Sequence, residues 1–317
     1  MIAVVFGVGF WAQEHYLQTA VSAPPPARQG PAPASIDPKV AASIQERVAK
    51  SGADVGIAFE TLDGRLAWSS RGDDVFHAAS TMKIPVMIEL FHQVREGKLK
   101  LSDPLPLKNE FHSLVDGSVF TLKPEDDSET DLYKAVGQTR TLDQLCDLMV
   151  TVSSNFATNL LIQKLGIENI RATVTSLHAG GMDIKRGVED QKAFDKGLNN
   201  TTTARGLATL LLAIAHGKAV DAESSAKMVE ILERQKFNEG IPAGVPGNIR
   251  VAHKTGEITK IHHDAGIVYA ERPFVIVVLV RGIEDFKQSS TLIAGITRHL
   301  YQASQPSANA SSSPPAD

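Results

Sequence analysis

Short runs rich in apolar residues near both ends of the chain predict β-strands. Residues 55–61 and 65–69 are short runs of this kind, joined by Leu62-Asp63-Gly64, which is typical of a hairpin turn. A second pair of runs, residues 265–270 and 274–281, lies near the other end of the chain. Because a lone hairpin is only marginally stable in water, we expect the two pairs to meet in one sheet.

Helical periodicity occupies the sequence beside and between these strands. Residues 38–51 form a predicted helix that Asp37 can cap, and residues 288–301 form another. The middle of the chain, about residues 81–232, consists mostly of helical patterns separated by polar loops. The prediction is an α+β fold: an antiparallel sheet built from the N- and C-terminal segments, flanked by helices, with a mostly helical middle subdomain. A cleft is expected at the seam between the two parts.

The first residues have the pattern of an export signal. Residues 1–11 are almost wholly apolar, as in a signal-peptide core, and are too few to span a bilayer. Val21-Ser22-Ala23 offers small residues for cleavage, although no Lys or Arg precedes the apolar run. Residues 1–23 are therefore interpreted as a signal peptide or a membrane anchor, and the protein as exported, either periplasmic or secreted.

Proline and small polar residues mark the borders of the folded unit. Residues 24–36 are Pro-rich and predict an extended linker, since proline rings restrict the backbone but bury little surface. Residues 304–317 are rich in Ser, Ala and Pro, which predicts a disordered tail. One folded domain is expected between them, at residues 37–303.

Composition excludes some classes of protein. The chain of 317 residues has a net charge of -4 and no basic stripe, so nothing in it favours nucleic-acid binding. Its single cysteine, Cys146, rules out an intrachain disulfide. Cys146 lies in an apolar periodic run, where buried packing is the expected role and a reactive thiol is the alternative.

The first candidate for chemistry is Ser80, which precedes a strongly apolar helical pattern at residues 84–95. A serine at a helix start lies near the positive end of the helix dipole. Lys83 follows one turn later on the same face, where a partly desolvated amine can take the serine proton. The pair alone is weak evidence, because a serine at this position is also an ordinary helix cap.

Two further clusters contain polar groups suited to the same site. Ser153 and Asn155 lie between two helical runs, where a hydroxyl can relay a proton and an amide can bind a carbonyl, although Ser and Asn also mark helix boundaries. Lys254, Thr255 and Gly256 lie on a predicted strand. The lysine and threonine suit an anionic substrate group, and the glycine permits close approach of a ligand or another backbone.

The order of these motifs, Ser-x-x-Lys, Ser-x-Asn and Lys-Thr-Gly, is that of the penicillin-recognising serine enzymes. Residues 149–161 and 200–204 closely resemble class A β-lactamases around their second motif and after their Ω loop, and the resemblance covers roughly residues 36–301. It implies a serine β-lactamase that hydrolyses the β-lactam amide through an acyl-enzyme on Ser80. It also implies a small-molecule β-lactam substrate, no metal or organic cofactor, and a monomer with no stable membrane span in its mature form.

The resemblance assigns roles in acylation. Ser80 attacks the carbonyl, with Lys83 as its base, or with Glu189 as the base through a water molecule. Backbone N–H groups of Ser80 and Glu257 hold the oxyanion, and Ser153 passes a proton to the departing nitrogen.

Substrate binding and deacylation involve the remaining motif residues. By resemblance, Asn155 binds the acylamino side chain, and Lys254 and Thr255, beside Gly256, hold the ring carboxylate. Glu189 lies where the family places the acid that activates the deacylating water. Without the resemblance, Glu189 would be interpreted as a solvated surface carboxylate.

Three departures from the family pattern affect these expectations. The Ω-loop asparagine that helps to hold the hydrolytic water is Ala193 here, so we expect a less well-positioned water, with Asn199 or Asn200 as candidate substitutes. The middle residue of the second motif is Ser154 instead of Asp, from which we expect only a local change. Residues 109–137 form a longer segment than usual, interpreted either as a loop that shapes substrate choice at the cleft mouth or as surface decoration.

His262, His263 and Asp264 follow the Lys254 strand. Their types suit a metal, but neighbours on a strand face opposite sides and converge poorly. We expect them instead to shape the turn after the strand, beside the cleft. The arginine that many class A enzymes use for the substrate carboxylate has no obvious counterpart, and Lys260 or one of these histidines is the candidate for that role.

Three other functions are compatible with the motifs. A penicillin-binding D,D-peptidase shares the first three motifs but lacks a glutamate that turns over the acyl-enzyme, and an esterase-type hydrolase would use the same nucleophile with slow deacylation. A non-catalytic sensor would use the fold as a scaffold, with no reason to keep Ser80, Lys83 and Lys254 together.

Overall fold

The structure is a computed structural model that describes residues 32–306. The expected signal peptide or anchor, most of the expected linker and most of the expected tail lie outside the described residues.

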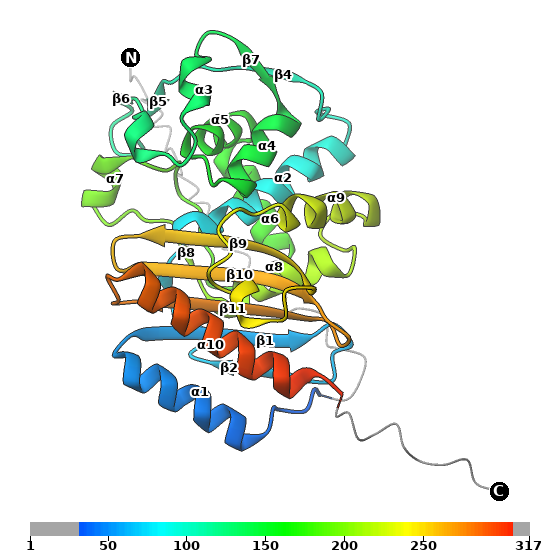
Figure 1. Ribbon diagram of the computed structural model, residues 1–317. Coiled ribbons are helices and arrows are strands. Elements are labelled where there is room, and N and C mark those ends of the chain that lie inside the picture. The colour runs from blue at the N-terminus through cyan, green and yellow to red at the C-terminus, as the bar shows by residue number, and fades with distance from the viewer. Residues whose placement is uncertain (1–31, 307–317) are drawn as a thin grey trace, which may run out of the picture. The chain divides into compact units, whose positions relative to one another are not determined.

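A five-stranded antiparallel sheet lies at the centre of the fold, with the strand order β2-β1-β11-β10-β9 (Figure 1). β1 pairs with β11 over its full length, so the strands predicted at opposite ends of the sequence do meet. β11 is buried at every position except Arg281, because helices cover both faces of the sheet. The five strands are β1 (Asp54–Thr61), β2 (Ala67–Ser70), β9 (Arg250–Ile258), β10 (Ile261–Tyr269) and β11 (Phe274–Arg281).

Two long helices cover one face of this sheet, and a third covers the other face (Figure 1). The first pair is α1 (Pro38–Ser51) and α10 (Phe286–Ser304), and the third is α8 (Ala204–Ala215). The side chain of Asp37 accepts a hydrogen bond from the backbone of Lys39 at 2.7 Å, which confirms the predicted cap of α1. Apolar side chains from α1, α10 and the sheet form one hydrophobic core.

The middle of the chain forms the helical part of the molecule. Its central helix, α2 (Lys83–Arg95), is buried at every residue from Lys83 to Phe91, as expected of a helix surrounded by others. Cys146 is also buried there, which confirms its packing role, and burial raises the pKa of its thiol. The surrounding helices are α3 (Asp131–Lys134), α4 (Leu142–Thr151), α5 (Asn155–Leu165), α6 (Ile167–Ser176), α7 (Gln191–Asp195) and α9 (Ala222–Glu233).

Three short two-stranded pairs hold loops in place around this helical part. β3 (Phe76–His77) pairs with β8 (Thr201–Thr202), next to the start of α2. β4 (Pro104–Pro106) pairs with β7 (Thr139–Thr141), and β5 (Phe111–His112) pairs with β6 (Val119–Phe120). The last pair lies within the long segment at residues 109–137.

The folded unit is longer at both ends than the sequence predicts. Ala34 exchanges backbone hydrogen bonds with the first hairpin, donating to Arg65 O at 2.8 Å, and Ile36 is buried in the core. At the other end, α10 continues to Ser304, and Gln305 Nε2 donates to Arg272 O at 3.2 Å. The composition of these segments is that of loops, so the prediction placed both borders of the folded unit too far inward. Backbone pairing at Ala34 and the side-chain amide of Gln305 are enough to hold the terminal residues in place. Within the described residues, no helix is both long and apolar enough to cross a membrane.

Candidate active site

Ser80 lies in a short 3-10 turn, Ala79–Met82, that leads directly into α2. Its side chain caps no helix, which removes the ordinary structural role considered for it. The preceding residue, Ala79, has a φ of 45°, a strained value of the kind found at functional sites. Ser80 faces a cavity of about 550 Å³ whose other walls include Ser153, Asn155 and Glu189. The structure thus brings predicted site residues from four separate segments to one cavity.

Lys83, the first residue of α2, is fully buried and bound to the turn between α4 and α5. Its Nζ donates to Ser153 O at 2.6 Å, to Ser153 Oγ at 3.1 Å and to Asn155 Oδ1 at 3.0 Å. Burial lowers the pKa of Lys83 to about 7, against the opposing effects of Asp127 and Glu189. A large share of the amine is therefore neutral near neutral pH and able to accept a proton.

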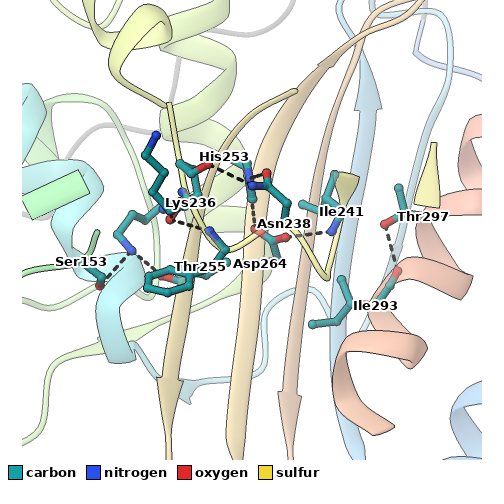
Figure 2. Close-up of polar contacts among 12 residues, drawn as sticks. Ser153, Lys236, Asn238, Ile241, His253, Thr255, Asp264, Ile293 and Thr297 are labelled. Atoms are coloured by element: carbon teal, nitrogen blue, oxygen red, sulfur yellow. Dashed lines mark hydrogen bonds and ion pairs between the residues drawn. The ribbon is translucent and has the colours of Figure 1, made fainter. Parts of the chain in front are cut away.

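Lys254 reaches the same hydroxyl from β9. Its Nζ donates to Ser153 Oγ at 3.0 Å and to Thr255 O at 2.9 Å (Figure 2). Burial, and then the charge of Lys83, lower the pKa of Lys254. Since both amines donate to Ser153 Oγ, the hydroxyl proton of Ser153 is free to be given to a substrate atom.

Gly256 allows β9 to pass directly beside the turn that contains Ser80. A Cβ atom at this position would lie 3.0 Å from Thr81 N and 3.1 Å from Ser80 N. These neighbours are backbone atoms, so any side chain would push the strand away from the nucleophile. The sequence-based expectation of a close approach at Gly256 is confirmed. Glu257, the next residue, lines the cavity, and burial followed by the charge of Glu239 raises its pKa.

Glu189 lies on the loop before α7 with a φ of 60°, a second strained residue at the site. Its Oε1 accepts from Asn155 Nδ2 at 3.1 Å, so Asn155 links Glu189 to Lys83. Asn159 holds this loop against α5, accepting from Val188 N at 2.7 Å and donating to Val188 O at 2.9 Å. Burial, and then Asp126, raise the pKa of Glu189. The solvated-surface interpretation of Glu189 does not fit these contacts.

The two asparagines considered as substitutes for the missing Ω-loop asparagine both bind Arg186 at the base of the loop. Asn199 Oδ1 accepts from Arg186 Nη2 at 3.0 Å, and Asn200 Oδ1 accepts from Arg186 N at 3.1 Å. They stabilise the base of the loop, so the expectation that one of them replaces the asparagine at Ala193 is not supported by their contacts. Ala193 is buried, and beside the loop a second cavity of about 280 Å³ reaches both Ser80 and Glu189.

The long segment at residues 109–137 is part of the site. Asp127 Oδ2 accepts from Phe156 N at 2.8 Å, from Tyr133 Oη at 2.9 Å and from Ser154 Oγ at 3.3 Å. Ser154 in turn accepts from Ala157 N and caps α5, so its replacement of Asp has only the expected local effect. The sequence analysis treated residues 109–137 as one segment and missed the role of Asp127, whose contacts cross 27 to 29 positions of sequence. Of the two interpretations, surface decoration is the one that the contacts contradict.

We expect Asp127→Ala to destabilise the protein by about 1–3 kcal/mol, because the backbone N–H of Phe156 and the hydroxyl of Tyr133 lose their acceptor. Thermal unfolding followed by circular dichroism measures the change. Asp127→Asn is the matched variant and keeps an oxygen acceptor, so its loss should be smaller. Equal melting temperatures for the wild type and Asp127→Ala would contradict this role.

His262, His263 and Asp264 lie within β10 and not in a turn, which corrects the sequence-based expectation. The turn is made by Thr259 and Lys260, and Lys260 has a φ of 60°. His262 lines the cavity, whereas His263 faces away and donates from Nε2 to His77 O at 2.9 Å, while its Nδ1 accepts from Val280 N at 3.1 Å. Burial lowers the pKa of His263 to about 4. Lys260 Nζ lies 3.7 Å from a carboxylate oxygen of Glu284. Within residues 32–306, no three His, Cys, Asp or Glu side chains converge as a metal site would require.

The fold and the site together define a class, the penicillin-recognising serine hydrolases. The chain belongs to the beta-lactamase enzyme family, whose model matches residues 39–304. A β-lactamase of Rhodobacter capsulatus is 29% identical over 193 residues, which is 60% of each chain. One of Bacillus licheniformis is 28% identical over 54% of this chain and 58% of its own. The chain thus aligns with about three fifths of the length of these curated relatives.

Solved structures match over a larger share of the chain. A β-lactamase of Sphaerobacter thermophilus is 28% identical, with a TM-score of 0.72 over 84% of this chain and 96% of its own. PBP-A is also 28% identical, with a TM-score of 0.74 over 86% of this chain and 98% of its own. Both the lactamase and the penicillin-binding branches of the class are therefore similar to this chain.

Proposed function

We propose that the protein is a class A-like serine β-lactamase, which hydrolyses the β-lactam amide through an acyl-enzyme on Ser80. The observation that carries the proposal is the convergence of two buried amines, Lys83 and Lys254, on Ser153 Oγ beside the nucleophile. Such an arrangement keeps a proton acceptor and a proton donor fixed beside the reacting atoms.

Acylation begins when neutral Lys83 takes the proton of Ser80 and the serine oxygen attacks the β-lactam carbonyl. The N–H groups of Ser80 and Glu257 stabilise the negative charge on the carbonyl oxygen. As the carbon–nitrogen bond breaks, the ring nitrogen takes the proton of Ser153, which recovers a proton from one of the amines bound to it. The product of this step is an ester of Ser80.

Deacylation needs a second base, distinct from Lys83, that activates the hydrolytic water. Glu189 is our candidate for this base. Glu189 takes a proton from a water molecule, the water oxygen attacks the ester, and the Ser80 oxygen leaves with a proton. The raised pKa of Glu189 makes its carboxylate a stronger base than an exposed glutamate. Because no asparagine stands at Ala193, this water has one fewer partner than in the family pattern.

Binding groups line the rest of the cavity. Asn155 lines the cavity and would bind the acylamino side chain, and Thr255 lines it and would bind the ring carboxylate. Lys254 is buried behind Thr255, donates to Thr255 O at 2.9 Å, and would add its positive charge to this part of the site. Lys260 and His262 lie on the same wall and are the candidates for a further contact with this carboxylate.

The test of the function is burst and steady-state kinetics with a chromogenic cephalosporin. A serine β-lactamase should give one equivalent of rapid acylation followed by sustained hydrolysis. Absence of both phases in folded protein would refute the proposal. A burst without sustained hydrolysis would support acylation of the protein but would contradict its assignment as a lactamase.

A D,D-peptidase-like function is the second candidate, and two observations favour it. One is the similarity to PBP-A, a mutant of which has a solved structure described as an acyl-enzyme complex with penicillin G. The other is Ala193, which weakens the site of the deacylating water. Slow release of the acyl group, together with cleavage of a D-alanyl-D-alanine peptide, would support this alternative.

The acylation rate of the lactamase should rise with pH through about 7. The pKa of Lys83 is lowered to about 7, so its amine loses a proton as the pH rises past that value, and only the neutral amine accepts the Ser80 proton. Pre-steady-state acylation should be about tenfold faster at pH 8 than at pH 6. Lys83→Arg, which stays protonated, should give a slow and flat profile. A flat profile in the wild type would exclude Lys83 as the base.

We also propose that the protein is exported, with residues 1–23 as its signal peptide or anchor, and that it acts as a monomer. Membership in the beta-lactamase family supports export, since the substrates of such enzymes act outside the cytoplasm. Cell fractionation and N-terminal mass spectrometry test the first point, and sedimentation tests the second.

A further inference from the structure

Residues 235–241 cross the cleft as a strap between the helical part and the sheet. At one end, Gln235 Nε2 donates to Val150 O at 2.8 Å, and Lys236 N donates to Thr151 O at 3.0 Å. These acceptors are the last residues of α4, directly before the turn that contains Ser153. This end of the strap therefore holds the backbone that presents the Ser153 hydroxyl.

The other end of the strap is held by Asp264 on β10. Asp264 Oδ2 accepts from Ile241 N at 2.8 Å (Figure 2). A Cβ atom at Gly240 would lie 2.5 Å from the same carboxylate oxygen, so only glycine lets the strap pass this close. Between the two ends, Phe237, Glu239 and Gly240 form a wall of the cavity of about 550 Å³.

Asp264 also binds His253, the residue that precedes Lys254 on β9. The two side chains are 0% and 1% exposed, and His253 Nδ1 lies 2.9 Å from Asp264 Oδ1. His253 Nε2 lies 3.2 Å from Asn238 Oδ1 on the strap. Figure 2 shows His253 between these two partners.

The hydrogen bonds of Asn238 decide which of its atoms faces the ring. Asn238 Nδ2 donates to Gln235 O at 3.1 Å, so the amide oxygen must point at His253 Nε2. Both ring nitrogens of His253 then face oxygen acceptors, and both must donate. His253 is therefore doubly protonated and forms a buried, charge-balanced pair with the Asp264 carboxylate.

We infer that the His253–Asp264 ion pair is a positioning pair for acylation, which anchors the strap of residues 235–241 and so fixes the distance between Ser153 and Lys254. The inference rests on the proposed function. His253 and Lys254 are neighbours on β9 and face opposite sides of the sheet, so the pair acts through the strap and the strand without touching substrate. The Ser153 Oγ to Lys254 Nζ bond of 3.0 Å is the geometry that it maintains.

The strap depends on the proton at Nε2 of His253, because without it the hydrogen bond from Nε2 to Asn238 Oδ1 would be lost. A bare Nε2 lone pair would face the Asn238 oxygen, and the repulsion would release the middle of the strap. The charged or titratable groups around the pair are Lys254 on β9, His262 on β10 and Glu239 on the strap, of which Asp264 interacts with the first two.

Variants of Asn238 test the inference without disturbing the core, because Asn238 itself is exposed. Asn238→Leu removes the acceptor, and we expect acylation to slow about ten- to a hundredfold, with deacylation changed less than about twofold. Asn238→Asp supplies a charged acceptor and should restore the wild-type rate. Asn169→Leu, which removes a similar side-chain bond to Leu165 O far from the cleft, is the matched control and should leave both rates unchanged.

Stopped-flow acylation and single-turnover deacylation with a chromogenic cephalosporin separate the outcomes. Wild-type rates in Asn238→Leu would overturn the inference, as would equal slowing of both steps, which a merely structural role predicts. A wild type that is not acylated would instead refute the proposed function. Proton NMR adds a direct check: His253 should give two slowly exchanging ring N–H signals that His253→Gln removes, and a single signal would overturn the double protonation.

Discussion

Ser80→Ala is expected to abolish covalent labelling by a fluorescent penicillin and to lower kcat/KM by about 10⁴-fold or more. The reason is that Ser80 is the hydroxyl of the strained turn before α2 that faces the cavity, whereas Thr81 in the same turn is buried and donates its hydroxyl to Ala78 O at 2.6 Å. Labelling is measured by gel fluorescence and by intact mass, which should show one acyl group per wild-type chain and none in the variant. Ser176→Ala on the outer helix α6 is the matched control and should label fully.

The folded state of the variant must be checked before this result is interpreted. Ser80 makes no capping contact, so its melting temperature should stay within a few degrees of the wild type. If folded Ser80→Ala still forms a covalent adduct at the wild-type rate, another residue is the nucleophile and the whole assignment of the site is wrong.

Glu189→Gln is expected to separate the two halves of the reaction. The amide keeps an oxygen that can accept from Asn155 Nδ2, so the loop should hold its place, but it cannot take a proton from water. Labelling should persist while hydrolysis of the acyl-enzyme slows about 10²- to 10⁴-fold. Time-resolved intact mass spectrometry should show the acylated form accumulating to nearly one equivalent.

Glu168→Gln, on the surface of α6, provides the control for loss of a carboxylate and should turn over normally. If Glu189→Gln turns over at the wild-type rate, Glu189 is not the base for deacylation. An unlabelled variant would instead make Glu189 the base for acylation, which is the alternative to Lys83 considered above.

Local sequence patterns were sufficient for the fold and for the motif residues. The pairing of β1 with β11 followed from the need to complete a sheet, and the placement of Lys83, Ser153 and Lys254 followed from three short motifs on elements that the periodicity predicts. These features could be predicted because each depends on residues close in sequence, or on a hydrophobic face that must be covered.

The contacts that the sequence did not reveal are those between distant polar side chains. Asp127 binds Phe156 N across 29 positions, and Asn238 meets His253 across 15. Neither pair follows a helical or strand period, and each residue alone is an ordinary loop or strand residue. The extension of β10 through His262 and Asp264 was missed for a related reason, because buried polar partners replaced the apolar alternation that marks a strand.

The close contact at Gly256 limits how this protein can change by mutation. With backbone nitrogens 3.0 and 3.1 Å from a notional Cβ atom, every other amino acid at position 256 would displace the strand that carries Lys254. Random variation selected on new antibiotics would therefore leave this position untouched. Ile258 and Thr259, two exposed residues that line both cavities, carry no such restriction.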